Sequence, residues 1–367
     1  MPSDLLLGIV VAAALLFDFT NGFHDTANVV ATSISTRALP PRLAIALAAL
    51  LNFIGAFLSL KVAATIASGL VDAGAITLQI VFAGLVGAIL WNLLTWWFGL
   101  PSSSSHALIG GVVGAMLAAV GPSAIDGEGL LGKVVLPAVV APVLAFCVAG
   151  LAILCAYRFV GRLRPGPVTR GFRLGQVASG SLLALAHGTN DAQKTMGVIT
   201  LALVAHGSLP AVDPEVPTWV VVSSALAIAL GTYSGGWRII RTMGSKIIKM
   251  DAAQGFTAQG SGAAVILAAT HVGFPLSTTH VISGGVVGAG AAKRLSAVKW
   301  GVAGNMAVAW VLTLPAAGLT GAVAYGISSA AGGGTAGPIV VTVIVLAAIG
   351  LFARSRQAPP PIASEPA

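Results

Sequence analysis

Residues 99–114 read GLPSSSSHALIGGVVG, and residues 273–288 read GFPLSTTHVISGGVVG. The two stretches are identical at nine of sixteen positions, which include the proline, one serine, the histidine and the closing Gly-Gly-Val-Val-Gly. In each copy a proline and a run of hydroxyl side chains precede an apolar segment rich in glycine. Long-range self-similarity of this kind indicates an internal duplication, so we expect two structurally related halves.

A second motif is duplicated as well. NGFHDTAN occupies residues 21–28 and HGTNDAQK occupies residues 187–194, which aligns Asp25 with Asp191. The copies of this motif lie 166 residues apart and those of the first motif lie 174 apart. Both motifs therefore recur in the same order at nearly the same spacing, as expected if a whole half of the chain is repeated.

The composition is that of a membrane protein. Of the 367 residues, 56% are hydrophobic and only 8% are charged, against about 25% charged in soluble domains. Many apolar runs approach the ~20 residues that a helix needs to cross a bilayer. We therefore predict an all-α, polytopic helical bundle in a cell membrane, with the lipid bilayer as its surroundings. The net charge of +8 lies mostly in short loops, as membrane topology requires, and nucleic acid is excluded as a partner.

The duplication also suggests boundaries along the chain. We expect a first membrane half at 1–157, a linker at 158–173 and a second membrane half at 174–330. A final transmembrane helix is expected at 331–356. The Pro- and Ala-rich tail at 357–367 is expected to be disordered.

Equivalent loops of the two halves differ in charge. Arg37 and Arg42 follow the first acidic motif, whereas Asp213 and Glu215 follow its partner. Because positive loops favour the cytoplasmic side, such loops should lie on opposite sides of the membrane, which predicts inverted-topology repeats. The linker carries five arginines and no acid, and we expect it to be a cytoplasmic loop.

Some apolar runs are too short to cross a membrane. The runs at 106–120 and 280–292 predict re-entrant or broken helices, whereas the run at 42–70 reads as one continuous apolar segment. Irregular backbone at membrane depth is tolerated only where protein or a water-filled cavity covers it. The short runs therefore indicate a transport path between the halves.

Three acids lie within or beside apolar segments. A charged side chain at the centre of a bilayer costs ~2.5–3.5 kcal/mol on insertion scales, so such residues are usually functional. Asp25 and Asp191 occupy equivalent positions of the repeat, and we interpret both as functional. Asp18 has no acidic counterpart, and its role stays open between function and structure.

The hydroxyl clusters predict an anion site. Serine and threonine cap helices, and a helix N-terminus offers free N–H groups and partial positive charge. Capping alone accounts for one hydroxyl per helix but not for runs of three or four. Two such sites related by inversion could grip a tetrahedral oxyanion near the membrane midplane. The predicted hydroxyl contacts are Ser103, Ser104, Ser105, Ser277, Thr278 and Thr279.

Carboxylates beside an anion site require a partner. A cation or proton that neutralises Asp25 and Asp191 would make anion binding depend on that cation, which is coupling. Alternatively, either acid could accept a hydrogen bond from protonated phosphate. Lys194 could be the ion-pair partner of Asp191 or a contact to the anion. His106 and His280 could pack against helices or relay protons.

Two other classes of chemistry have little support. A metal site formed by His24, Asp25 and His187 has no supporting spacing, and no metal ligand is assigned. An enzyme that uses a serine and His106 is disfavoured because the chain lacks a G-x-S-x-G motif and because a symmetric duplication suits alternating access. We therefore expect a transporter and not an enzyme, without an organic cofactor.

Both pairs of motifs resemble those of the inorganic phosphate transporter (Pit) family, most closely its bacterial low-affinity branch. The resemblance covers nearly the whole chain. It implies a helical inverted-repeat carrier of the bacterial inner membrane, often a homodimer, that imports inorganic phosphate by cation symport. In that branch the driving ion is usually the proton, and phosphate travels partly as a complex with magnesium or another divalent ion. Sodium drives other branches, and some relatives carry sulfate.

The resemblance also assigns site residues. Besides the hydroxyl clusters, the resemblance implies contacts to phosphate from Asp25, Asn28, Asp191 and Gln193, and from its own position we also expect a contact from Lys194. The coupling cation is expected at Asp25, Asp191, His24 and Asn190. His24 and Lys194 stand where the family usually has asparagine, which disfavours a transferred sodium site. Sodium-coupled phosphate or sulfate transport, and a divalent-metal carrier, are the alternatives.

Overall fold

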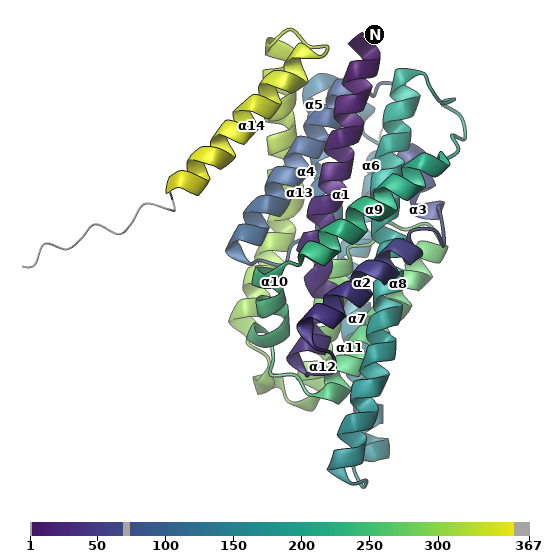
Figure 1. Cartoon of the computed structure of the whole chain (residues 1–367), viewed down its shortest axis with the longest axis vertical. Helices are drawn as coiled ribbons and strands as arrows, with labels where there is room; N and C mark the ends of the chain where they lie inside the picture. Colours follow the sequence, from purple (N-terminus) through teal and green to yellow (C-terminus); the bar gives the residue numbers. More distant parts are fainter. Residues whose placement is uncertain (1, 69–73, 356–367) are drawn as a thin grey trace, which may run out of the picture.

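The computed structural model describes residues 2–68 and 74–355, and within these ranges the protein is helical without strands (Figure 1). The first half contains α1 Pro2–Ser35, α2 Pro41–Gly55, α3 Lys61–Ser68, α4 Leu78–Phe98, α5 Ser104–Ala119, α6 Gly127–Leu130 and α7 Leu136–Val160. The second half contains α8 Pro165–His206, α9 Thr218–Ser234, α10 Trp237–Arg241, α11 Ala252–His271, α12 Thr278–Lys293 and α13 Trp300–Ala330, and α14 Ala336–Ser355 follows. The predicted all-α class is confirmed.

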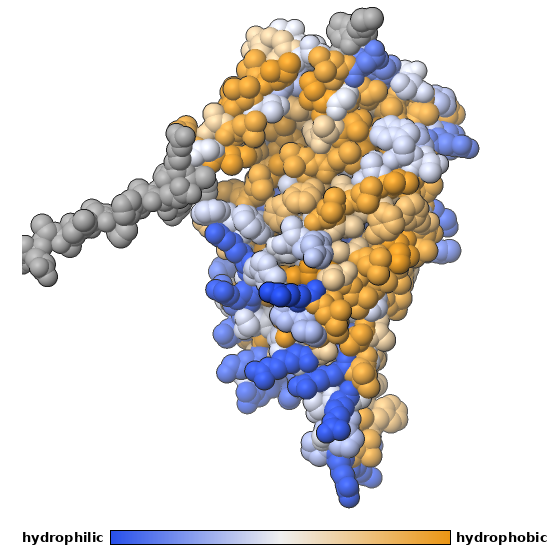
Figure 2. Space-filling view, viewed as in Figure 1, coloured by the Kyte–Doolittle hydropathy of each residue, from blue (hydrophilic) through white to orange (hydrophobic). Residues whose placement is uncertain are grey.

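Several helices are long and apolar enough to cross a bilayer. Among the described residues, four qualify: Ser3–Ser35, Leu78–Phe98, Gly127–Val160 and Trp300–Ala330. A fifth span is possible if α9 and the following Trp237–Lys246, bent by 58°, are counted as one. Apolar surface covers much of the molecule and polar residues gather towards its lower end (Figure 2). The protein is therefore a multi-pass membrane protein.

The two halves use the same helix pairings. In the first half α5 lies against α4 and against α13 of the second half, and in the second half α12 lies against α11 and against α7 of the first half. Glycine permits both contacts, because a Cβ on Gly114 would lie 2.0 Å from the Gly318 carbonyl oxygen and one on Gly288 would lie 2.2 Å from that of Phe146. In Figure 1, α1 descends from the N-terminus and α8 rises from the lower tip. The inverted topology itself remains a prediction.

The short helices begin where the sequence indicates. α5 and α12 have 16 residues each, and their N-caps are Ser103 and Ser277. Both helices are mostly buried within the bundle. Short helices with protein on all sides fit the requirement that chain breaks at membrane depth be covered.

Two expectations about connections are corrected. The run at 42–70 is not continuous, because α2 ends at Gly55 and α3 starts at Lys61. A side chain from α8, described below, caps α3 and so stabilises the break. The linker at 158–173 is mostly helical and not a loop, because α7 extends to Val160 and α8 begins at Pro165, a residue suited to a first helical turn.

The C-terminal end of the described chain is helical. α14 forms a helix where the final transmembrane helix is expected, but its apolar part, Ala336–Leu351, belongs to the shorter apolar helices. Its crossing of the bilayer therefore remains a prediction. The expected disordered tail at 357–367 lies outside the described residues.

Candidate functional site

One hydroxyl of each cluster is used for capping. The Ser103 hydroxyl accepts a hydrogen bond from the His106 amide at 3.1 Å, and the Ser277 hydroxyl accepts one from the His280 amide at 3.3 Å. Each cap fixes the first turn of its helix. The hydroxyls that follow are free to turn towards the space between the helices.

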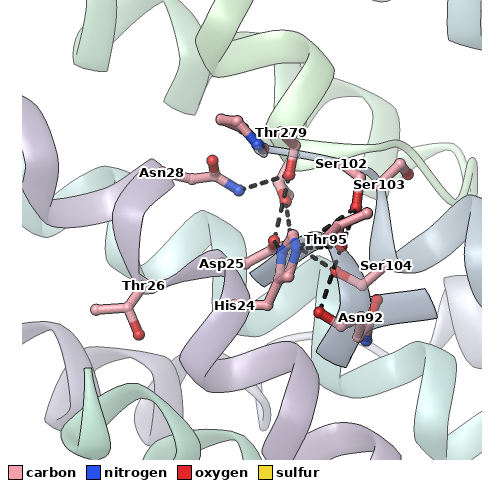
Figure 3. A network of polar contacts seen from close by, with 12 residues as sticks. His24, Asp25, Thr26, Asn28, Asn92, Thr95, Ser102, Ser103, Ser104 and Thr279 are labelled. Carbon is pink, nitrogen blue, oxygen red and sulfur yellow. Dashed lines mark hydrogen bonds and ion pairs between the residues drawn. The ribbon is translucent and has the colours of Figure 1, made fainter. Parts of the chain in front are cut away.

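Three of those remaining hydroxyls converge on one carboxylate. Ser104 of α5 and Thr278 of α12 donate to Asp25 Oδ2 at 3.0 and 3.3 Å, and Thr279 donates to Oδ1 at 3.2 Å (Figure 3). His24 Nδ1 lies 2.8 Å from the same Oδ1. Asp25 is only 2% exposed. The structure therefore brings the N-terminal turns of both short helices to a single buried acid on α1.

His24 is oriented by a second set of hydroxyls. Its Nε2 lies 3.0 Å from Thr95 Oγ1 and 3.4 Å from Ser102 Oγ. Because a carboxylate only accepts hydrogen bonds, Nδ1 donates to Asp25, while Nε2 faces the hydroxyls of Thr95 and Ser102. Thr95 belongs to no repeated motif, and its polarity within an apolar helix is the one sequence feature that indicates a role for it.

The second acid lies in a different environment. Asp191 forms an ion pair with Lys194, its Oδ2 lies 3.1 Å from His187 Nε2, and Thr278 donates to it at 3.2 Å. His187 Nδ1 is in turn 3.1 Å from Asn52 Oδ1. The single hydroxyl hydrogen of Thr278 can serve only one of the two acids at a time, so the two carboxylates share this donor.

Lys194 is enclosed by oxygen atoms. Besides Asp191, its ammonium donates to the Ser105 hydroxyl and to the Leu276 carbonyl oxygen at 2.9 Å. The equivalent contact in the other half is from the Asn28 amide to the Thr279 hydroxyl at 2.9 Å. The same position therefore holds a neutral amide in one half and a full positive charge in the other.

Two residues expected at the site contact neighbouring helices instead. Gln193 Oε1 accepts from the backbone amides of Val62 and Ala63 at 2.8 and 3.2 Å, and so caps α3. Asn190 Nδ2 donates to the Thr270 hydroxyl at 2.8 Å. A role for either residue in binding substrate or cation remains a prediction.

The two histidines of the short helices face each other. The rings of His106 and His280 meet edge to face with centroids 4.8 Å apart, and the His280 ring lies 4.3 Å from that of Trp310. His280 Nδ1 lies 3.4 Å from the Ala138 carbonyl oxygen. Among the described contacts neither ring hydrogen-bonds to Asp25 or Asp191. Their part in a proton relay remains a prediction.

Three of these side chains could hold a cation together. Asp25, His187 and Asp191 each offer a ligand atom, and these atoms all lie within 4.8 Å of one another in a fully buried setting. Carboxylate oxygen and imidazole nitrogen suit several metal ions. This group differs from the metal site considered from the sequence, which combined His24, Asp25 and His187, because Asp191 takes the place of His24.

Comparison with known proteins agrees with the motifs. The profile of the phosphate transporter family matches residues 21–321. The chain is 55% identical to a probable low-affinity inorganic phosphate transporter of Mycobacterium bovis, over 96% of this chain and 85% of the relative. A protein of Bacillus subtilis with the same description is 44% identical over 88% of this chain and 96% of the relative. A solved structure described as the sodium-dependent phosphate transporter superposes with a TM-score of 0.79 at 25% identity, and covers 88% of this chain and 98% of its own.

Proposed function

Since the chain belongs to the phosphate transporter family and carries inorganic phosphate across a cell membrane, we propose that it does so by cation symport. Alternating access would operate around a site near the membrane midplane, where α5 and α12 begin. The proton is the proposed driving ion. The observation that carries this proposal is the convergence of Ser104, Thr278 and Thr279 on Asp25.

The Asp25 carboxylate occupies the donors that a phosphate would need. Carboxylate and phosphate oxygens both accept hydrogen bonds from hydroxyls and from helix N-termini. While Asp25 is charged, it competes with phosphate for these donors and also repels it. A proton or cation that neutralises Asp25 weakens both effects, so the hydroxyls become available to the anion. Binding of phosphate then depends on the cation, which is the requirement for symport.

In the second half, Lys194 supplies the positive charge that a bound proton or cation supplies at Asp25. Its ammonium neutralises Asp191 from within the protein, so only Asp25 needs an external partner. The ammonium also stays within reach of Ser105, at the first turn of α5. We therefore assign Lys194 both ion pairing with Asp191 and attraction of the anion.

The choice of ion and substrate rests on different features. His24 and Lys194 replace amide side chains that could have offered oxygen atoms to sodium, which favours the proton. At neutral pH phosphate can donate a hydrogen bond to Asp25 and sulfate cannot, which favours phosphate. Magnesium could accompany phosphate as a complex. Sodium coupling, sulfate transport and divalent-metal transport are the alternatives.

The test is uptake by the purified protein in proteoliposomes. Labelled phosphate should accumulate under a proton gradient without sodium and should not accumulate under a sodium gradient alone, with magnesium added or omitted in parallel. Excess sulfate should compete poorly. Asp25→Asn should abolish coupled uptake while the protein still inserts, whereas Asp213→Asn, on an exposed loop, should transport normally. Accumulation by Asp25→Asn at the wild-type level would contradict the proposal.

The assembly and placement belong to the same proposal. We propose a homodimer in the bacterial inner membrane, with the arginine-rich segment 158–173 on the cytoplasmic side. Labelling of single cysteines in that segment from either side of sealed vesicles tests the orientation, and the mass of the detergent-solubilised protein tests the dimer.

A further inference from the structure

Asp18 is a buried acid that phosphate binding at Asp25 does not use. It lies on α1, seven residues and therefore about two helical turns before Asp25. Its side chain is 0% exposed, and neither carboxylate oxygen has a hydrogen-bond partner.

The groups around Asp18 also lack partners. Asn21 on α1 and Thr195 on α8 are its polar neighbours. Neither the amide of Asn21 nor the hydroxyl of Thr195 makes a side-chain hydrogen bond. Five buried polar atoms are thus left without partners in one place, where native proteins ordinarily satisfy such atoms.

Among the described residues, no unpaired cation faces Asp18. The charged groups that face it from α8 are Asp191 and Lys194, which are paired with each other. α4 contains no titratable residue, and α9 contains only Tyr233, which is 65% exposed. On α1 itself, His24 and Asp25 already bind one another.

The three buried acids therefore differ in kind. Asp25 receives hydrogen bonds from three hydroxyls and from His24, and Asp191 has a lysine, a histidine and a threonine. Asp18 has no donor in full hydrogen-bond geometry and only the Asn21 amide and the Thr195 hydroxyl close to it. An isolated carboxylate away from water is so unfavourable that the group takes up a proton instead.

We propose that Asp18 is a second coupling site, which carries a proton while it is buried and releases it when the transport cycle exposes it to water. This inference rests on the proposed symport and adds a proton site separate from the phosphate site. A proton needs only one carboxylate oxygen. The Asn21 carbonyl oxygen and the Thr195 hydroxyl can accept the hydrogen bond of the protonated acid after a small rotation. A metal ion would need several oxygen ligands already directed at it.

The experiment separates proton movement from phosphate movement. Proteoliposomes contain a pH-sensitive dye, and two reactions are measured: uptake driven by a proton gradient, and exchange of labelled for unlabelled phosphate without a gradient. Asp18→Asn imitates the protonated acid. It should keep exchange close to that of wild type, because the Asp25 site is unchanged and the amide matches the size and neutrality of the protonated acid. The number of protons that enter with each phosphate should fall, because only the Asp25 site still takes one up, and accumulation of phosphate against a gradient should fall with it.

Two further variants control the result. Asp18→Glu retains a titratable group and should restore part of the proton entry. Asp4→Asn makes the same chemical change at an exposed position of the same helix and should behave as wild type. Proton entry by Asp18→Asn at the wild-type ratio to phosphate would overturn the inference. The inference would also be overturned if sodium entered with phosphate in the wild-type protein and Asp18→Asn lost that sodium entry, because Asp18 would then bind a metal ion.

A second measurement applies if Asp18→Asn fails to fold. The infrared spectrum of the wild-type protein should contain the carbonyl band of a protonated carboxyl group. This band should shift in heavy water, and its position should change in Asp18→Glu. Absence of such a band would overturn the inference. If the wild-type protein shows no symport at all, the proposed function fails, and the infrared band still decides whether Asp18 holds a proton.

Discussion

Lys194→Asn tests whether this lysine acts as a built-in cation. The change replaces the ammonium with the side chain that the equivalent position, Asn28, carries in the first half. Asp191 would lose its ion-pair partner, while the Ser105 hydroxyl and the Leu276 carbonyl oxygen would lose their donor. Asp191 would retain only His187 and the shared hydroxyl of Thr278.

The magnitude follows from the burial of the pair. Both side chains are at most 1% exposed, and removal of one partner of a buried ion pair costs ~3–5 kcal/mol, since the other charge remains uncompensated. At about 1.4 kcal/mol for each factor of ten, this corresponds to a loss of ~10²- to 4 × 10³-fold in the population of the transport-competent state. Sodium should restore part of the activity, because hard cations bind oxygen atoms and three ligand groups are left facing the vacated position.

The assay is phosphate uptake by reconstituted Lys194→Asn over a range of sodium concentrations. Uptake without sodium should fall at least ~100-fold, by the same cost of an uncompensated buried charge, and should rise with sodium. Lys61→Asn, which removes an exposed lysine bound to the His271 carbonyl oxygen, is the matched control. The double variant Asp191→Asn with Lys194→Asn should recover stability in detergent, because no buried charge remains. Wild-type uptake by Lys194→Asn without sodium would refute the reasoning.

Two further predictions concern packing and placement. Gly114→Ala should lower the stability of the purified protein by ~1–3 kcal/mol or more, since its Cβ would meet the Gly318 carbonyl oxygen. Gly304→Ala, with open space around the new Cβ, should not lower it. Equal melting temperatures of the two variants would contradict this prediction. Gln193→Ala should raise the rate of amide hydrogen exchange at Val62, because the Gln193 side chain caps α3. The KM for phosphate should stay nearly unchanged. A large rise in KM with normal exchange at Val62 would instead make Gln193 a substrate contact.

Much of the site follows from short stretches of sequence. The caps at Ser103 and Ser277 are local, because a serine before an apolar run supplies the acceptor that a first helical turn lacks. The importance of Asp25 and Asp191 is also readable, since a repeated acid in an apolar segment has few structural explanations. Glycine-rich motifs likewise predict close helix contacts without any coordinates.

The break after Gly55 and the helical linker could not be predicted in this way. Hydropathy alone does not distinguish a continuous apolar helix from two short ones, and the amide groups of α3 are capped by Gln193, which lies more than a hundred residues away. The arginines and prolines of 158–173 favour a loop by composition, yet Pro165 is accommodated as the first residue of α8.

The sequence by itself determined that this protein is a duplicated helical membrane carrier with buried acids and capped short helices, because those features depend on composition and on neighbours along the chain. Only the tertiary structure decided which groups meet: Thr278 beside both Asp25 and Asp191, Lys194 against Asp191, and Thr195 beside Asp18. These relations join residues up to 253 positions apart. Helix packing sets them, and local periodicity carries no record of which helices will pack together.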